Sequence, residues 1–202
     1  MSKATIWNYL KQRTELSDEA IAGIMGNMEA ESNCEACRVQ GDFTSDRRVS
    51  KQYAQQVNSG MLPNWHKDDK GWGLCQWTWN TRKANLKSTC ESYGVGIEDE
   101  NAQLAFMLAE MQMEFTSTWN KLLNCHSIYD AASYVCCEYE LPAVKNVAAR
   151  ADFGQTIYKQ FHGKDVTPDP APAPAGDNIA QAIKLIRQAL DLLVNSSLKG
   201  GE

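Results

Sequence analysis

Residues 20–33 constrain the fold more than any other part of the sequence, because they predict a buried helix. Their large apolar side chains recur at intervals of three and four residues, which places them on one helix face: Ile21, Ile24, Met25 and Met28. Ser17 is a suitable N-cap for this helix. Gly23 and Gly26 each weaken a helix by about 1 kcal/mol relative to alanine, so they indicate that another helix or a ligand passes close by. We expect a helix over residues 17–32 at the centre of the domain.

Two acidic residues, Glu29 and Glu31, lie in the last turn of this expected helix. Residues two apart on a helix are separated by about 200°, so the two carboxylates cannot form a catalytic pair with each other. Glu31 lies about 70° to one side of the apolar face and Glu29 about 90° to the other, so geometry hardly separates them. A partly desolvated glutamate is a candidate general acid. The alternative is that both are solvated charges at a helix end, as most glutamates are.

The remaining hydrophobic pattern predicts a mainly α-helical domain. No segment shows the alternation of a strand, whereas most segments repeat at helical spacing. Residues 33–71 are polar and rich in turn residues, and such a long irregular segment in a compact domain is usually functional. Besides the central helix, we expect helices at residues 4–13, 50–57, 82–93, 99–114, 117–125, 127–139 and 145–161.

The C-terminal part of the chain has a different composition. A Pro/Ala-rich linker over residues 164–176 follows the expected helical domain of residues 1–163. Within residues 177–202, apolar side chains at 177–195 follow a heptad pattern, which predicts an amphipathic helix with two adjoining apolar seams. These seams favour a homo-oligomer, with docking on the helical domain as an alternative. Contact with a membrane surface is a weaker alternative, because the helix carries few cations.

The overall charge and the hydrophobic pattern exclude several classes of partner. The net charge of -5 gives no electrostatic case for binding nucleic acid. The N-terminus lacks the continuous apolar core of a signal peptide, and no apolar run approaches the roughly 20 residues of a membrane span. We therefore expect synthesis in a host cytoplasm without a signal peptide, and any action on the cell wall only after release.

The chain has seven cysteines, so at least one thiol is unpaired within it. Without a signal peptide, reduced thiols are expected, and free cysteine usually packs as a small buried hydrophobe. Cys34 and Cys37 have the spacing of half a zinc site, but no second cysteine or histidine pair follows at ligand spacing. We expect neither a metal nor any other cofactor.

Residues 71–79 are dense in glycine and contain three tryptophans within eight residues: Trp72, Trp77 and Trp79. A planar indole ring packs well on the apolar face of a sugar, so this segment is a candidate wall of a carbohydrate site. The alternative is that these tryptophans belong to the hydrophobic core.

Two ordered motifs resemble those of a known family. They are Ala22-Gly23-Ile24-Met25-Gly26-Asn27-x-x-Ala30-Glu31-Ser32-Asn33 and Gly71-Trp72-Gly73-Leu74-x-Gln76-Trp77-Thr78-x-x-x-Arg82-Lys83. Together with further likenesses at residues 39–43, 56–60, 139–142 and 150–151, they make residues 1–162 similar to the phage tail lysozyme family of peptidoglycan hydrolases. The resemblance implies a mostly helical, lysozyme-like fold. It also implies cleavage of the β-1,4 bond between N-acetylmuramic acid and N-acetylglucosamine in peptidoglycan glycan strands.

The resemblance also implies roles for individual residues. The proton donor of the family is the glutamate of a Glu-Ser dipeptide, which implies that Glu31 rather than Glu29 is the catalytic acid. A Gly-Leu-x-Gln motif lines the family's substrate cleft, which implies sugar contacts for Gly73, Leu74 and Gln76. Within this cleft we expect Gln76 to bind an N-acetyl group.

The tryptophans and the second carboxylate are less well defined. Trp77 is expected to stack on a sugar ring, with Trp72 as part of the same wall. Asp42 and Glu140 are expected at the cleft, and the sequence does not choose a second catalytic carboxylate among these two and Asp46, Asp68 and Asp69. Two positions depart from the family pattern, Cys75 and Leu141, and the second leaves the role of Glu140 open.

The function expected from these features is that of a phage lysis enzyme, or endolysin. Three alternatives stay open at this point. A lytic transglycosylase would form a 1,6-anhydro product. A wall amidase or peptidase would use Cys75 with His66 or His126 as the base. The third is a phage structural module that binds the wall without cleaving it.

Overall fold

The computed structural model describes residues 3–164, so the expected linker, C-terminal helix and oligomer contact lie outside the described residues. Within this range the protein is mainly α-helical, as predicted, and its only β interactions are isolated bridges. None of the described helices is long and apolar enough to cross a membrane. Residues 3–164 form eight α-helices: α1 (Lys3–Arg13), α2 (Asp18–Ser32), α3 (Arg48–Asn58), α4 (Asn80–Ser92), α5 (Glu100–Met113), α6 (Thr116–Leu123), α7 (Ile128–Tyr134) and α8 (Val147–Phe161).

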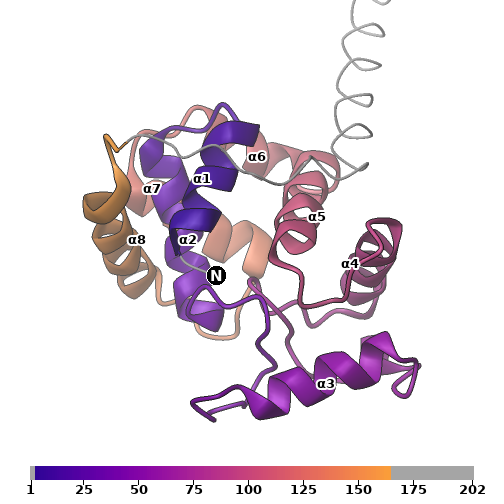
Figure 1. Ribbon diagram of the computed structural model, residues 1–202. Coiled ribbons are helices and arrows are strands. Elements are labelled where there is room, and N and C mark those ends of the chain that lie inside the picture. Colours follow the sequence, from indigo (N-terminus) through magenta and orange to yellow (C-terminus); the bar gives the residue numbers. More distant parts are fainter. Residues whose placement is uncertain (1–2, 165–202) are drawn as a thin grey trace, which may run out of the picture. The chain divides into compact units, whose positions relative to one another are not determined.

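Helix α2 forms the centre of the domain, as its apolar sequence predicts. Figure 1 shows it enclosed by α1, α7 and α8, and it packs most extensively on α8 and α7. Both of its glycines lie at helix crossings. A Cβ atom on Gly23 would come within 2.5 Å of the Ala131 side chain, and one on Gly26 within 2.2 Å of the backbone oxygen of Arg150. The close approach of neighbouring helices therefore explains both glycines.

The ends of α2 are fixed by local hydrogen bonds. The Ser17 hydroxyl accepts a hydrogen bond from the backbone N–H of Ala20 at 3.0 Å, which confirms the expected N-cap. At the other end, Asn33 adopts a left-handed conformation with φ 57°, and its N–H bonds to Glu29 O at 3.0 Å. The helix therefore stops directly after the Glu-Ser dipeptide, which leaves Glu31 in its last turn.

The expected helix at residues 127–139 differs from the structure in one respect. It divides into α7 and a π-helix, η2 (Val135–Glu140), after which Leu141 turns left-handed with φ 52°. Pro142 follows and cannot continue a helical hydrogen-bond pattern. Since π-helical turns occur frequently at functional sites, the end of η2 is a natural place to look for active groups.

Two irregular segments flank α3, which lies at the edge of the described domain in Figure 1. They meet at Trp72, which forms isolated antiparallel bridges with Val39 and with Trp77. The short 3-10 helix η1 (Trp65–Lys67) interrupts the second segment. The long polar stretch predicted to be functional therefore folds back against the tryptophan-rich segment.

Candidate active site

A pocket of about 440 Å³ lies where the end of α2 meets the tryptophan-rich segment and the end of η2. Three structural units therefore contribute to one site, although they are far apart in the sequence. The residues in it with chemical or contact roles are Glu31, Cys75, Gln76, Trp79, Arg82 and Glu140.

Glu31 and Glu29, which the helical pattern could not separate, have different surroundings. Glu31 lines the pocket, its side chain is 19% exposed, and it accepts a hydrogen bond from Arg150 Nη2 at 2.5 Å. Arg150 lies on α8, where its other guanidinium nitrogen donates to Asn27 Oδ1 at 3.0 Å. Glu29 pairs instead with Lys3 of α1 at 2.7 Å. Of the two glutamates, Glu31 is the one available to a ligand in the pocket.

Glu140, the last residue of η2, is the second carboxyl of the pocket. Its Oε1 atom is buried and has no hydrogen-bond partner in the described part of the chain. Burial raises the pKa of Glu140 to about 8, and the nearby negative charge of Glu31 acts in the same direction. Its surroundings therefore favour the protonated form of this carboxyl.

A buried polar network includes Tyr139, the residue that precedes Glu140. Arg82 donates two hydrogen bonds to Glu110, from Nε and Nη2, each 2.7 Å long. The hydroxyl of Tyr139 donates to the same carboxylate at 2.6 Å. Trp77 Nε1 lies 3.3 Å from this carboxylate and 3.2 Å from the Tyr139 hydroxyl. The network fixes the backbone next to Glu140.

The expected stacking role of Trp77 and Trp72 does not agree with their burial. Trp77 is 1% exposed and Trp72 is 0% exposed, so neither ring offers a face to a sugar. Their indole N–H groups are used inside the protein, that of Trp72 on Ile97 O at 2.9 Å. Trp79, by contrast, is 58% exposed and lines the pocket. The aromatic side chain available for stacking is Trp79.

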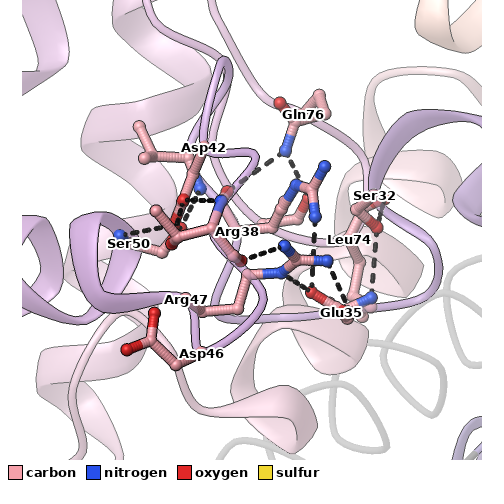
Figure 2. Close-up of polar contacts among 12 residues, drawn as sticks. Ser32, Glu35, Arg38, Asp42, Asp46, Arg47, Ser50, Leu74 and Gln76 are labelled. Carbon is pink, nitrogen blue, oxygen red and sulfur yellow. Dashed lines mark hydrogen bonds and ion pairs between the residues drawn. The ribbon is translucent and has the colours of Figure 1, made fainter.

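The Gly-Leu-x-Gln segment is held to the end of α2 by side-chain hydrogen bonds. Figure 2 shows Ser32, the residue after Glu31, whose hydroxyl donates to Leu74 O at 3.0 Å. Leu74 is fully buried, and a Cβ atom on Gly73 (φ 76°) would come within 2.4 Å of Gln103. Neither residue is among those lining the pocket; they shape the segment rather than expose side chains to a ligand.

Gln76 lines the pocket but has limited hydrogen-bonding capacity left. Its Nε2 donates to the backbone oxygens of Arg38 at 3.1 Å and Gly73 at 2.9 Å, which Figure 2 shows in part. Among the hydrogen bonds of the described residues, these use both amide N–H groups. The Oε1 atom remains for a ligand, so Gln76 can accept a hydrogen bond from an N–H but not donate one.

Asp42 has a structural role, in contrast to its expected place at the cleft. It is buried and accepts four hydrogen bonds from the backbone and hydroxyl groups of Thr44 and Ser50, at 2.5–2.9 Å (Figure 2). Burial alone would raise its pKa, but these bonds hold the pKa of Asp42 well below the ordinary value. Because Ser50 lies in the first turn of α3 and the N-cap Arg47 makes no side-chain cap bond, Asp42 caps this helix.

The remaining candidate acids, Asp46, Asp68 and Asp69, are not among the described residues that line the pocket. Asp68 is ion-paired with the buried Lys83. All seven cysteines are free, and five are buried, as predicted. Burial, with a contribution from Glu140, raises the pKa of the Cys75 thiol well above its ordinary value. A thiol nucleophile needs a thiolate and a base, and no histidine is among the described residues that line the pocket.

Sequence reasoning missed the role of Arg150, although a signal for it exists. The buried residues of α8 are Arg150, Gly154 and Ile157, spaced by four and three residues. An arginine on the same face as buried apolar residues needs an anionic partner inside the protein. The helical spacing of these three positions could therefore have indicated a buried cation, whereas its partner Glu31 became visible only in the fold.

A helical domain with a carboxyl-lined pocket at the end of its central helix agrees with the lysozyme type of protein. The family described as phage tail lysozyme matches residues 2–161, and the chain belongs to this family. No curated protein matches the chain. Family membership suggests a lysozyme-like peptidoglycan hydrolase, with peptidoglycan as the implied substrate.

Proposed function

We propose that the protein hydrolyses the β-1,4 bond between N-acetylmuramic acid and N-acetylglucosamine. The observation that carries this proposal is the convergence of two carboxyls, Glu31 and Glu140, in one pocket of a domain from this family. Most glycosidases use such a pair on the two sides of the scissile bond. The bond position itself comes from the family resemblance.

In this proposal Glu31 protonates the glycosidic oxygen as the bond breaks. Positive charge then develops on the anomeric carbon, and the carboxylate form of Glu140 stabilises it or activates the attacking water. Gln76 Oε1 accepts a hydrogen bond from the N–H of an N-acetyl group. A lytic transglycosylase needs no second carboxyl, because the 6-hydroxyl of the sugar attacks instead. The presence of Glu140 beside Glu31 in the pocket therefore supports hydrolysis over formation of an anhydro product.

Mass spectrometry of the muropeptides released from purified peptidoglycan tests the proposal. We expect fragments that end in a reducing N-acetylmuramic acid. Fragments lighter by one water, ending in the 1,6-anhydro sugar, would show a lytic transglycosylase instead. Cleaved stem peptides with intact glycan would show an amidase or peptidase, and unchanged peptidoglycan would contradict any hydrolase.

Replacing Trp79 with alanine tests the carbohydrate contact. Loss of one aromatic contact of about 0.5–1.5 kcal/mol should raise the KM for soluble glycan fragments roughly twofold to tenfold. We expect little change in kcat, because the indole is not one of the reacting groups. Tyr129→Ala is the matched control, since Tyr129 is also exposed but lies outside the pocket. An unchanged KM in Trp79→Ala would show that this indole does not contact sugar.

We further propose that the enzyme acts in lysis of the host wall by a phage. The support is the phage family together with the proposed bond specificity. Expression of the protein with and without a membrane-permeabilising partner, with culture turbidity as readout, tests this role. We expect lysis only in the culture that also expresses the partner. The absence of lysis in both cultures would contradict the role.

A further inference from the structure

The charges around the pocket do not pair completely. Three carboxyls, Glu31, Glu110 and Glu140, lie near two arginines, Arg82 and Arg150. Arg82 is engaged by Glu110 through two hydrogen bonds, and Arg150 by Glu31. Glu140 is therefore the carboxyl for which no dedicated cation is left.

The surroundings of Glu140 favour its neutral form. One of its oxygens is buried without a hydrogen-bond partner among residues 3–164, and a desolvated, unpaired carboxylate is its costliest form. The charged and titratable groups with the largest effects on it come from four separate segments. Glu31 on α2 disfavours the charged form, whereas Arg82 on α4, Arg150 on α8 and the adjacent Cys75 thiol partly favour it.

We propose that Glu31 and Glu140 share a single proton, which Glu140 stores before cleavage and Glu31 delivers to the glycosidic oxygen. The inference rests on the proposed function and deepens it. Two like charges in one pocket repel each other, and Arg150 hydrogen-bonds the carboxylate of Glu31 alone, so one proton and one negative charge on the pair is the favoured arrangement. Before cleavage the proton therefore lies on Glu140, whereas Glu31 is the residue that protonates the glycosidic oxygen.

The proposed reaction returns the carboxyl pair to its starting protonation state. The proton leaves Glu140 for Glu31, so Glu140 becomes the carboxylate that faces the developing positive charge. Arg150 keeps its hydrogen bond to Asn27 while Glu31 is neutral. Glu31 then gives the proton to the leaving oxygen as the bond to the anomeric carbon breaks. Water supplies its hydroxyl to that carbon, and its remaining proton returns to the pair.

A titration of side-chain carboxyls by ¹³C NMR tests proton storage without any activity measurement. We expect Glu140 to titrate near pH 8 in the full-length wild-type protein and at least one pH unit lower in Glu31→Gln, which removes the repelling charge. Glu29→Gln is the matched control on the same helix and should leave Glu140 unchanged. A wild-type Glu140 that titrates at an ordinary value of about 4.3 would overturn the inference.

The pH dependence of Glu140→Gln provides the functional test. The amide replaces a neutral acid of the same shape, so the melting temperature should stay close to that of the wild type. At pH 7 we expect kcat to fall at least a hundredfold with KM changed less than threefold, and the alkaline limb of kcat/KM to move to lower pH. Glu140→Asp, which keeps a titratable group, should recover part of the rate.

Glu138→Gln is the control for this variant, because Glu138 lies on the same π-helix but pairs with Lys121 outside the pocket. It should keep the wild-type rate and pH profile. Wild-type rate and profile in Glu140→Gln would overturn the inference, even if the enzyme cleaves peptidoglycan as proposed. Failure of the proposed function would appear differently, as coupled titration of the two carboxyls in a protein that does not cleave the wall.

Discussion

Peptidoglycan cleavage by Glu31→Gln is expected to be roughly 10²- to 10⁴-fold slower than by the wild-type protein at pH 7, the usual contribution of a general acid. The amide has the size of the carboxyl and reaches the same pocket, but it has no proton to give to a leaving oxygen. Arg150 retains its bond to Asn27, so we expect the fold to survive. The measurement is the rate at which new reducing ends appear in purified wall.

The neighbouring glutamate provides an internal control for this experiment. Glu29→Gln changes the same residue type, two positions earlier on the same helix, where the carboxylate pairs with Lys3. It should retain the wild-type rate. If Glu31→Gln keeps more than a few per cent of the wild-type rate while remaining folded, Glu31 is not the proton donor.

The largest effect on stability is expected from Glu110→Gln. This carboxylate is buried and binds Arg82 through two hydrogen bonds. Removing one partner of a buried pair typically costs about 3–5 kcal/mol, because the other charge stays buried without compensation. We therefore expect the free energy of unfolding in urea to fall by about this amount.

A double variant separates the cost of an isolated charge from the cost of changed packing. Arg82→Met with Glu110→Met removes both charges together, so the remaining cost is the lost acceptor of the Tyr139 hydroxyl and Trp77 Nε1. Its stability should lie well above that of either single variant, so the two effects should not add. A Glu110→Gln variant as stable as the wild type would show that Arg82 finds another partner or water.

Much of the fold follows from local sequence patterns. Helix α2, its cap at Ser17 and the close packing at Gly23 and Gly26 were all predictable, because spacing and backbone freedom are properties of neighbouring residues. The break between α7 and the π-helix η2 was not predictable, because an apolar pattern does not distinguish the two kinds of turn.

The site was less predictable, because its residues acquire their roles from contacts between distant segments. Three tryptophans in a non-periodic segment give no indication of which ring faces solvent, and only Trp79 does. Asp42 was a reasonable candidate acid from the sequence, but in the fold its carboxylate accepts hydrogen bonds from Ser50 in α3. The raised pKa of Glu140 comes from its burial and from the nearby charge of Glu31, and both depend on contacts between segments that are far apart in the sequence.

The crossing of α2 and α8 has a consequence for engineering this protein. Replacing helical glycines with alanine is a routine route to thermostability, and Gly26 would be an obvious target on a sequence basis. Here the added methyl group would meet the backbone oxygen of Arg150, and Gly154 closes the same contact. The substitution would displace Arg150, which hydrogen-bonds Glu31, so any gain in helix propensity would come with a shifted Glu31 side chain. Stabilising libraries should leave this crossing untouched and vary the solvent-facing surfaces instead.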